Sequence, residues 1–456
     1  MDLSKIFEPI NEKKFDIFHW KAMITTGMGV FTDGYDLSSI GIVLGAVLVS
    51  FNITKADPSY TLWQSLLTSS ALIGAVFGAI IFGILANKGR KKFYGIDVAL
   101  LTVGALLQAF VQTPLQLVIV RFLVGLGTGA DYVLSPLILA EHSNAKDRGK
   151  LLALGFGFIW GLGATTAALI YFIFENIVSQ DLLWRIVLAF GAVPAASVIY
   201  LRRKMPETAR YLARIKGDTE KLSEVIKTIS GKQVIVNTNV KDNTRFIDYF
   251  KKQWRIYTVA ALLWFLFDIV AYAGILFGPN DIAKSIGINN PAVFQFINEF
   301  LFTIPGALLA VATLDKLGRR IMQAAGFIGM GLSFLVFALI PGSPIFKLLM
   351  YGLNRFSSQA GPGSVSAAGM LGVELAPTKV RALVQAITVL SGRIGAVVTA
   401  FVFPYLFSTY GLNFAIGFLS VISIISAILT FTIPETKGKS LEEASKEIEI
   451  IQVKSR

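Results

Sequence analysis

Long apolar runs follow one another along almost the whole chain, separated by short polar segments. About 20 apolar residues are needed to cross the roughly 30 Å hydrocarbon core of a bilayer as a helix. The pattern therefore predicts twelve membrane-spanning helices. We place them at residues 22–51, 61–86, 93–112, 115–140, 151–177, 183–202, 254–279, 293–314, 321–341, 345–375, 379–408 and 411–433.

Composition agrees with this pattern. Of the 456 residues, 54% are hydrophobic and 16% charged, whereas soluble domains carry about 25% charged residues. The fold class we expect is an all-α membrane protein with twelve transmembrane helices in two pseudo-symmetric six-helix bundles.

Basic residues crowd alternate loops between the expected spans. These loops hold Lys88, Arg90, Lys91, Lys92, Lys146, Arg148, Lys150, Lys316, Arg319, Arg320, Lys379 and Arg381, and the opposite loops hold only Lys55, Arg185, Lys284 and Lys347. The positive-inside rule then places both termini and the central loop in the cytoplasm. The net charge of +13 reflects this topology, so we expect no nucleic-acid partner.

Two polar segments interrupt the apolar pattern. They divide the chain into an N-terminal bundle (1–202), a cytoplasmic linker with short helices (203–252), a C-terminal bundle (253–436) and a cytoplasmic tail (437–456). Within them we expect helices near 219–229 and 440–450. The first apolar segment is too long for a cleavable signal peptide.

Several chemistries are disfavoured by what the sequence lacks. There is no cysteine and there are only two histidines, so we expect no disulfide, metal site or cofactor. No phosphate-binding P-loop, serine-nucleophile elbow or zinc-protease motif occurs. We therefore expect neither ATP-driven pumping nor an enzyme.

The two halves repeat one another. Arg90 corresponds to Arg319 after 229 residues, Arg121 to Arg355 after 234, Glu141 and Arg148 to Glu374 and Arg381 after 233, and Pro206 to Pro434 after 228. A fixed long period indicates duplication, and transporters built from repeats bind their solute between them near the bilayer midplane.

Ionisable residues inside the expected spans are the main functional signal. They are Asp33, Asp36, Arg121, Asp131, Asp268, Arg355 and Arg393. A charge at the bilayer centre costs about 3 kcal/mol on insertion scales, so each needs a partner or a wet cavity. They could also pair simply for packing, and Arg121 and Arg355 could hold neighbouring backbone.

A carboxylate that alternates between wet and closed surroundings can gain and lose a proton. Asp33, Asp131 and Asp268 are the candidates for proton coupling, and Asp36 is a further one that could instead lie near water. Trp264, Asp268 and Tyr272 share one helix face. Arg393 supplies a fixed positive charge that suits phosphate or a carboxylate, although an ion pair with Asp268 would cancel this argument.

The basic loop motifs predict a conformational latch. Arg90 and Arg319, with Asp315 four residues before Arg319, could pair across the cytoplasmic face or could merely set topology. The repeated pairs Glu141–Arg148 and Glu374–Arg381 belong to the same set of candidates.

The sequence resembles the major facilitator superfamily over essentially its whole length. The motifs are Gly83–Lys92 (GILANKGRKK), Leu314–Arg320 (LDKLGRR), Pro206–Leu212 (PETARYL) and Pro434–Glu443 (PETKGKSLEE). Within the superfamily it is most similar to phosphate:proton symporters, through Gly27–Asp36, Arg121–Ser135, Trp264–Tyr272 and Ser391–Ala396.

That resemblance implies roles for individual residues. It assigns Asp33, Asp36 and Asp131 to the proton route, and Tyr132, Trp264, Asp268 and Tyr272 to the substrate site. Arg393 replaces a binding lysine, and Trp160 replaces a glutamine. An expected asparagine in span ten is absent, which leaves Ser364 or Ser366 as donors.

We therefore expect a monomeric, proton-coupled symporter of a small anion in the plasma membrane, with inorganic phosphate as the first candidate. An aromatic acid could stack on Trp160 and pair with Arg393, and the run Asp33–Asp36 also resembles aromatic-acid:proton symporters. Other carboxylates, a sugar, and a non-transporting membrane sensor of the same fold remain alternatives.

Overall fold

The computed structural model describes residues 5–234 and 241–454, in which all regular secondary structure is helical. Ten helical segments in this described part are long and apolar enough to cross a membrane. Residues 235–240 of the expected linker and 455–456 of the expected tail lie outside the described residues.

The helices of the first half follow the expected order. They are α2 (Ile17–Ser50), α3 (Tyr60–Leu85), α4 (Arg90–Phe93), α5 (Ile96–Gln108), α6 (Pro114–His142), α7 (Arg148–Leu152), α8 (Ile159–Phe174), α9 (Gln180–Ala189) and α10 (Ala192–Lys204). A π-helical segment, Ala153–Phe158, joins α7 to α8.

The second half repeats this sequence of elements. It contains α13 (Phe246–Phe277), α14 (Ala283–Ser285), α15 (Pro291–Asn298), α16 (Ile304–Leu317), α17 (Arg319–Leu339), α18 (Pro344–Ala360), α19 (Pro362–Val365), α20 (Met370–Glu374), α21 (Thr378–Tyr410) and α22 (Leu412–Thr430). Two further π-helical segments, Gly278–Ile282 and Glu299–Thr303, interrupt its helices.

The helix ends differ from the expected spans for local reasons. α2 begins at Ile17 because Asp16 caps it, accepting from the backbone N–H groups of Phe18 and His19. The helix expected over 345–375 ends at Ala360, since Gly361 and Pro362 interrupt the regular backbone. The expected third and tenth spans coincide with α5 and α18, which have only 13 and 17 residues.

Small residues set the closest helix contacts. A Cβ on Gly125 of α6 would clash with the carbonyl oxygen of Ala71 on α3, and one on Gly395 of α21 would clash with that of Phe265 on α13. Glycine at these positions allows the backbones to touch. The pairs α3–α6 and α13–α21 consequently pack tightly and fix the positions of their polar side chains.

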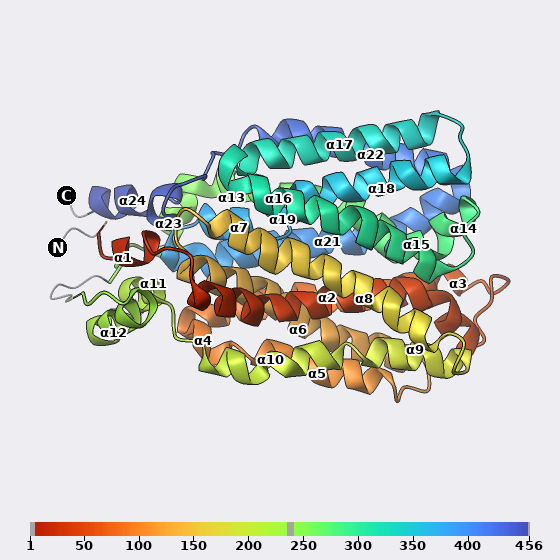
Figure 1. Ribbon diagram of the computed structural model, residues 1–456, viewed down its shortest axis with the longest axis horizontal. Helices are drawn as coiled ribbons and strands as arrows, with labels where there is room; N and C mark the ends of the chain where they lie inside the picture. The colour runs from red at the N-terminus through yellow and green to blue at the C-terminus, as the bar shows by residue number, and fades with distance from the viewer. Residues whose placement is uncertain (1–4, 235–240, 455–456) are drawn as a thin grey trace.

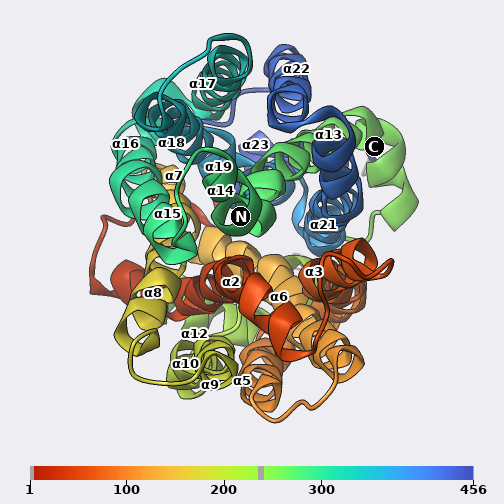
Figure 2. The same ribbon diagram turned by 90° about the vertical axis from the view of Figure 1, so that its right-hand side faces the viewer.

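Viewed from the end far from the termini, the helices form two groups. α2, α3, α5, α6, α8, α9 and α10 lie in the lower group and α13 to α22 in the upper one (Figure 2). The groups meet where α3 packs on α21, α2 on α13 and α8 on α15. Side chains from both groups face each other along this contact.

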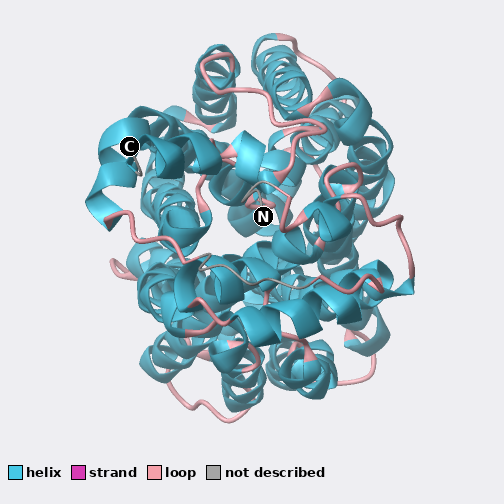
Figure 3. Cartoon of the chain, turned by 90° about the vertical axis from the view of Figure 1, so that its left-hand side faces the viewer, coloured by secondary structure: helices cyan, strands magenta, loops and turns pink. Residues whose placement is uncertain are grey.

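Both termini lie at one end of the long axis (Figure 1). Short helices and loops cover the bundle at that end (Figure 3): α1 (Glu8–Asn11), α11 (Ala209–Tyr211), α12 (Thr219–Ser230), α23 (Leu441–Ala444) and α24 (Glu447–Lys454). Ile6, Phe7 and Ile10 form a small apolar core with α11 and α12. The N-terminal segment is thereby attached to the linker. We call the short helices α1, α11, α12, α23 and α24, with the loops between them, the terminal cap.

Candidate functional site

A small cavity lies between the two groups of helices. Its volume is about 40 Å³, which is room for a few waters. It is lined by Tyr132, Phe156, Trp160, Phe267, Asp268, Ala271, Tyr272, Ile275, Arg355, Ser358, Gln359, Gly363, Ala367 and Arg393. Aromatic walls with a few charged and amide groups are typical of a small-molecule site.

Arg393 lies at the centre of one cluster in this cavity. Its Nη1 donates to Asp268 Oδ2 at 3.2 Å and to the Tyr272 hydroxyl. Its guanidinium lies 4.3 Å from the centre of the Tyr132 ring. Arg393 Nε has no hydrogen-bond partner among the described residues. The close packing of α13 on α21 creates this cluster, and it leaves a buried donor available.

Four of the predicted substrate residues line the cavity together with Arg393: Tyr132, Trp160, Asp268 and Tyr272. Trp264 is buried one turn from Asp268, where its ring meets that of Tyr132 edge-on at 6.0 Å between ring centres. It supports the aromatic wall from behind.

Ser364 and Ser366 do not line the cavity, which corrects the expectation that they supply the polar contacts of span ten. Ser364 donates to the backbone oxygen of Gln359 at 2.6 Å, and Ser366 donates to Gln323 at 2.8 Å. Ser358 and Gln359, about one turn earlier, line it instead. Gln359 also donates to Gly157 O in the other half at 2.9 Å. The helix break at Gly361 turns the later serines away.

Arg355 forms a second charged pair in the wall. Its Nη2 donates to Glu299 Oε1 at 2.8 Å. From the sequence, Arg355 was a charged residue within a span without a substrate role, and Glu299 was not among the candidates. The available signal for Glu299 is a carboxylate inside the apolar run of expected span eight.

The three aspartates of α2 and α6 have different surroundings. Asp36 pairs with Arg121 at 3.2 Å and also accepts from Gln108. Arg121 donates to the carbonyl oxygen of Leu67 as well, so this cluster binds side chains and backbone together. Asp36 is buried, and the alternative that it lies near water is wrong.

Asp33 differs from Asp36 and Asp131 in having no cationic partner among the described residues. Its Oδ1 accepts from Thr128 Oγ1 at 2.7 Å, and its Oδ2 has no partner in the described residues. No cation lies within ion-pairing distance of it in that part of the chain, and its side chain is 0% exposed. An unpaired buried carboxylate is stable in its protonated form.

Asp131 belongs to a triad that the sequence analysis missed. Arg202 Nη1 lies 2.6 Å from both Asp97 Oδ2 and Asp131 Oδ1, and its guanidinium stacks 4.5 Å from the Tyr94 ring centre. Asp97 and Arg202 lie near the ends of the expected third and sixth spans, where charged residues are common. In the fold all three side chains are buried.

The predicted latch residues all meet at the end that carries the termini. Glu141 pairs with Arg90 of its own half and with Arg381 of the other half, the latter at 2.6 Å. Glu374 pairs with Arg319 of its own half at 2.9 Å and with Arg148 of the other half at 2.7 Å. Asp315 pairs with Arg319 at 2.8 Å. The duplication thus produces two matching ion-pair clusters.

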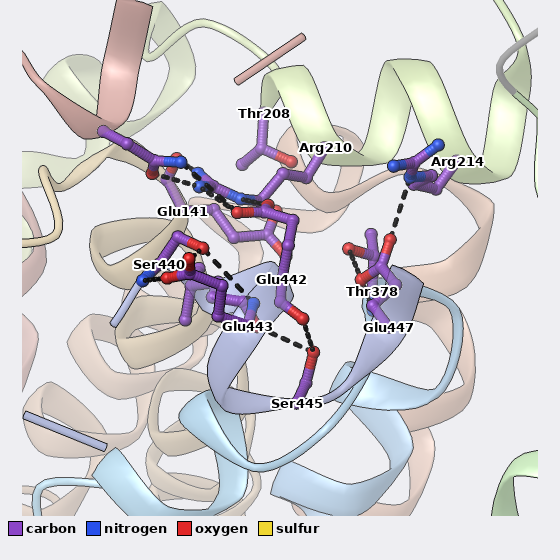
Figure 4. Close-up of polar contacts among 12 residues, drawn as sticks. Glu141, Thr208, Arg210, Arg214, Thr378, Ser440, Glu442, Glu443, Ser445 and Glu447 are labelled. Atoms are coloured by element: carbon purple, nitrogen blue, oxygen red, sulfur yellow. Dashed lines mark hydrogen bonds and ion pairs between the residues drawn. The ribbon is translucent and has the colours of Figure 1, made fainter. Parts of the chain in front are cut away.

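The terminal cap joins these clusters through residues that were not predicted (Figure 4). Arg210 pairs with Glu442 at 2.7 Å, and Arg214 pairs with Glu447 at 2.9 Å. Glu447 also accepts from the Thr378 hydroxyl at 2.8 Å. Burial raises the pKa of the Glu442 carboxyl, but the Arg210 guanidinium outweighs it and lowers that pKa to about 2.

The opposite end of the bundle is closed by fewer and weaker contacts. Gln64 donates to Asp281 at 2.9 Å, Asn290 donates to Glu175 at 3.2 Å, and Asn280 donates to Gly41 O. These contacts also join the two halves. The two halves are therefore joined by several buried ion pairs at the terminal end and by single hydrogen bonds at the other.

A family model described as "Sugar (and other) transporter" matches residues 22–448. The chain is 31% identical to "Probable inorganic phosphate transporter 1-3" of Arabidopsis thaliana, with 98% of each protein covered. It is 31% identical to "Inorganic phosphate transporter 1-6" of Oryza sativa subsp. japonica, covering 98% of this chain and 96% of the relative.

Solved structures share the fold. The proton:xylose symporter XylE bound to 6-bromo-6-deoxy-D-glucose, a major facilitator superfamily protein, aligns with a TM-score of 0.79 and 20% identity over 94% of this chain and 99% of that chain. The inward-open conformation of XylE from E. coli gives a TM-score of 0.69 and 21% identity over 95% and 100% of the two chains.

Proposed function

The chain belongs to the sugar (and other) transporter family of the major facilitator superfamily, and on this premise we propose that it is a proton-coupled symporter of inorganic phosphate. The observation that carries the proposal is Arg393, a buried guanidinium with an unpaired Nε in the wall of the central cavity. A guanidinium binds the oxygens of a phosphate through several N–H groups at once. The names of the relatives support phosphate as the anion.

The ion pair between Arg393 and Asp268 supplies the coupling. While Asp268 is ionised, it neutralises Arg393, and an entering anion gains little from the cavity. A proton on Asp268 removes that competition and leaves the guanidinium free for phosphate. Proton and anion then bind together, and the loaded cavity carries less unbalanced charge when its gates close.

Asp33 is proposed as the second proton carrier. It is buried without a cationic partner in the described residues, so charging it in the closed state costs free energy that protonation avoids. Asp131 and Asp36 pair with Arg202 and Arg121, and we assign them to the proton route only through their proximity to Asp33 on α6 and α2.

The transport cycle we propose is rocking of two six-helix bundles, 1–202 and 253–436, about the cavity. It requires the twelve spans expected from the sequence, with the termini, the linker 203–252 and the tail 437–456 on the cytoplasmic side of the plasma membrane. A monomer contains the whole cavity. The ion-pair clusters of Glu141 and Glu374 would then be the cytoplasmic latch and would break each time the protein opens inward.

An organic anion is the second candidate, because aromatic rings surround the charged groups. Trp160, Phe156 and Phe267 line the cavity beside Arg393 and Arg355. An aromatic carboxylate would stack on these rings and pair with an arginine. The small volume of the enclosed cavity favours phosphate.

Purified protein in proteoliposomes tests the proposal. With the outside acidic, we expect accumulation of labelled phosphate above the outside concentration, and collapse of accumulation when a protonophore removes the pH gradient. Arg393→Ala should abolish uptake, whereas Arg393→Lys should retain part of it. Accumulation of benzoate instead of phosphate would favour the organic anion, and binding without accumulation would refute transport.

A further inference from the structure

The cavity contains a second arginine that the scheme above does not use. Arg355 of α18 lines the same cavity as Arg393 and is only 5% exposed. Its guanidinium lies 5.9 Å from the centre of the Trp160 ring, which belongs to the other half of the chain. Arg355 therefore faces the interface between the halves, where a solute would bind.

The partner of Arg355 is incompletely satisfied. Glu299 Oε1 accepts from Arg355 at 2.8 Å and from Gln295 at 3.2 Å, but Glu299 Oε2 has no hydrogen-bond partner in the described residues. A buried ion pair without full hydrogen bonding contributes little net stability. Glu299 also begins a π-helical turn in the middle of an apolar segment, and such turns are frequent at functional sites.

The charges around the cavity balance in pairs. Asp268 neutralises Arg393, and Glu299 neutralises Arg355. An anion that enters this neutral set adds uncompensated negative charge. One proton on Asp268 and one on Glu299 would release both guanidiniums. These two protons, apart from the one proposed for Asp33, prepare the cavity for two negative charges.

We propose that Arg355 is a second anion-binding residue, released from Glu299 when that carboxylate accepts a proton, and that the cavity thereby takes a divalent tetrahedral oxyanion. The proton comes from the solution that loads the cavity and binds a Glu299 carboxylate oxygen. The hydrogen bond from Arg355 Nη2 is then given to the substrate. This inference rests on the proposed function and specifies the charge of its substrate.

Other groups around the pair do not replace Glu299 in this role. The titratable and charged groups that face it are Arg355 and Tyr351 from α18, with Tyr272 from α13 near the arginine. α15 and α8 contribute Gln295 and Trp160, which are uncharged. Of the residues that the structure describes, Glu299 is the only carboxylate that pairs with Arg355.

The experiment compares anions of one shape and different charge. Binding of inorganic phosphate, sulfate and the monovalent methanesulfonate to the purified protein is measured by calorimetry between mildly acidic and alkaline pH. We expect Arg355→Gln to weaken sulfate and phosphate binding by about 100-fold and methanesulfonate binding by less than about threefold. In Glu299→Gln the affinity for sulfate should fall less steeply with rising pH than in the wild type, because only Asp268 still has to bind a proton.

A double variant, Glu299→Gln with Arg355→Gln, serves as the fold control. Because it removes both partners of the buried pair, its thermal midpoint should stay near that of the wild type. If Arg355→Gln alone does not fold, the double variant gives the same comparison between sulfate and methanesulfonate.

Equal weakening of sulfate and methanesulfonate, or a wild-type pH dependence in Glu299→Gln, would overturn the inference. The two variants could change sulfate binding as expected while the wild type does not bind phosphate. That result would refute the proposed substrate and leave the inference standing. Wild-type protein that binds none of the three anions would refute both.

Discussion

Arg381 and Glu141 are 240 positions apart in the chain and form a buried ion pair of 2.6 Å that joins its two halves. The repeat produces the matching pair of Arg148 and Glu374 at 2.7 Å. Each glutamate is also held by an arginine of its own half. In the proposed cycle, each glutamate would keep that local partner when the halves separate.

Loss of one cross-half pair should favour opening at the terminal end. The chain has no cysteine, so a single Ala367→Cys change in the cavity wall gives a clean reporter. An impermeant thiol reagent is added from the cytoplasmic face. We expect Arg381→Gln to raise the labelling of the cysteine at position 367 about tenfold. The matched control is Arg245→Gln, because Arg245 pairs with Asp248 at 3.4 Å in an exposed position. Equal labelling in both variants would argue against a latch.

Asp33→Asn should separate exchange from accumulation. Asparagine resembles a protonated aspartate and can still accept a hydrogen bond from Thr128. We expect counterflow of phosphate to persist and gradient-driven accumulation to be lost in proteoliposomes. Asp36→Asn, which leaves Arg121 without its carboxylate, should mainly lower thermal stability. Normal accumulation by Asp33→Asn would remove this residue from the coupling scheme.

Arg202 should be a major determinant of stability. It lies 2.6 Å from both Asp97 and Asp131, so Arg202→Gln leaves two buried like charges together. We expect a loss of about 3–5 kcal/mol in the free energy of unfolding, seen as a lower thermal midpoint. Adding Asp97→Asn should restore part of it, since one of the two charges is then removed. A midpoint unchanged by Arg202→Gln would show that the triad is not ionised.

The terminal cap should weaken in acid. The pKa of Glu442 is lowered to about 2 in the folded protein, below its unfolded value of about 4.3. Its ion pair with Arg210 therefore stabilises the protein fully above the unfolded pKa, and this contribution is lost as the pH falls through the folded pKa.

Glu442→Gln tests this pH dependence. Its thermal midpoint should lie below that of the wild type at neutral pH, and the difference should shrink as the pH falls below about 4. Glu443→Gln is the control, because Glu443 is exposed and only caps the adjoining short helix. A difference that is constant with pH would contradict the assignment.

Much of the fold follows from the sequence because a bilayer leaves few choices. Apolar runs of sufficient length must become helices there, since backbone groups find no water to bind. The candidate latch residues were named from the sequence because the duplication repeats their spacing. In the fold Arg90 pairs with Glu141 and Arg319 with Glu374, and their role as a latch stays a prediction. The cap contacts of Arg210 and Glu442 were missed because they join segments 232 residues apart with no repeat to mark them.

The sequence by itself determined where the apolar helices run, that the chain is duplicated, and which charges are forced into nonpolar surroundings. It could not decide which charge meets which, because pairing depends on how neighbouring helices rotate and approach. Only the packing of α13 on α21 placed Asp268 against Arg393, and only the packing of α18 near the π-helical turn Glu299–Thr303 placed Glu299 against Arg355. The break at Gly361 likewise brought Gln359, and not Ser364, into the cavity. Electrostatic interactions fall off over a few ångströms, so the tertiary contacts decide which carboxylates are paired with a cation and which, like Asp33, have a carboxylate oxygen without a partner among the described residues.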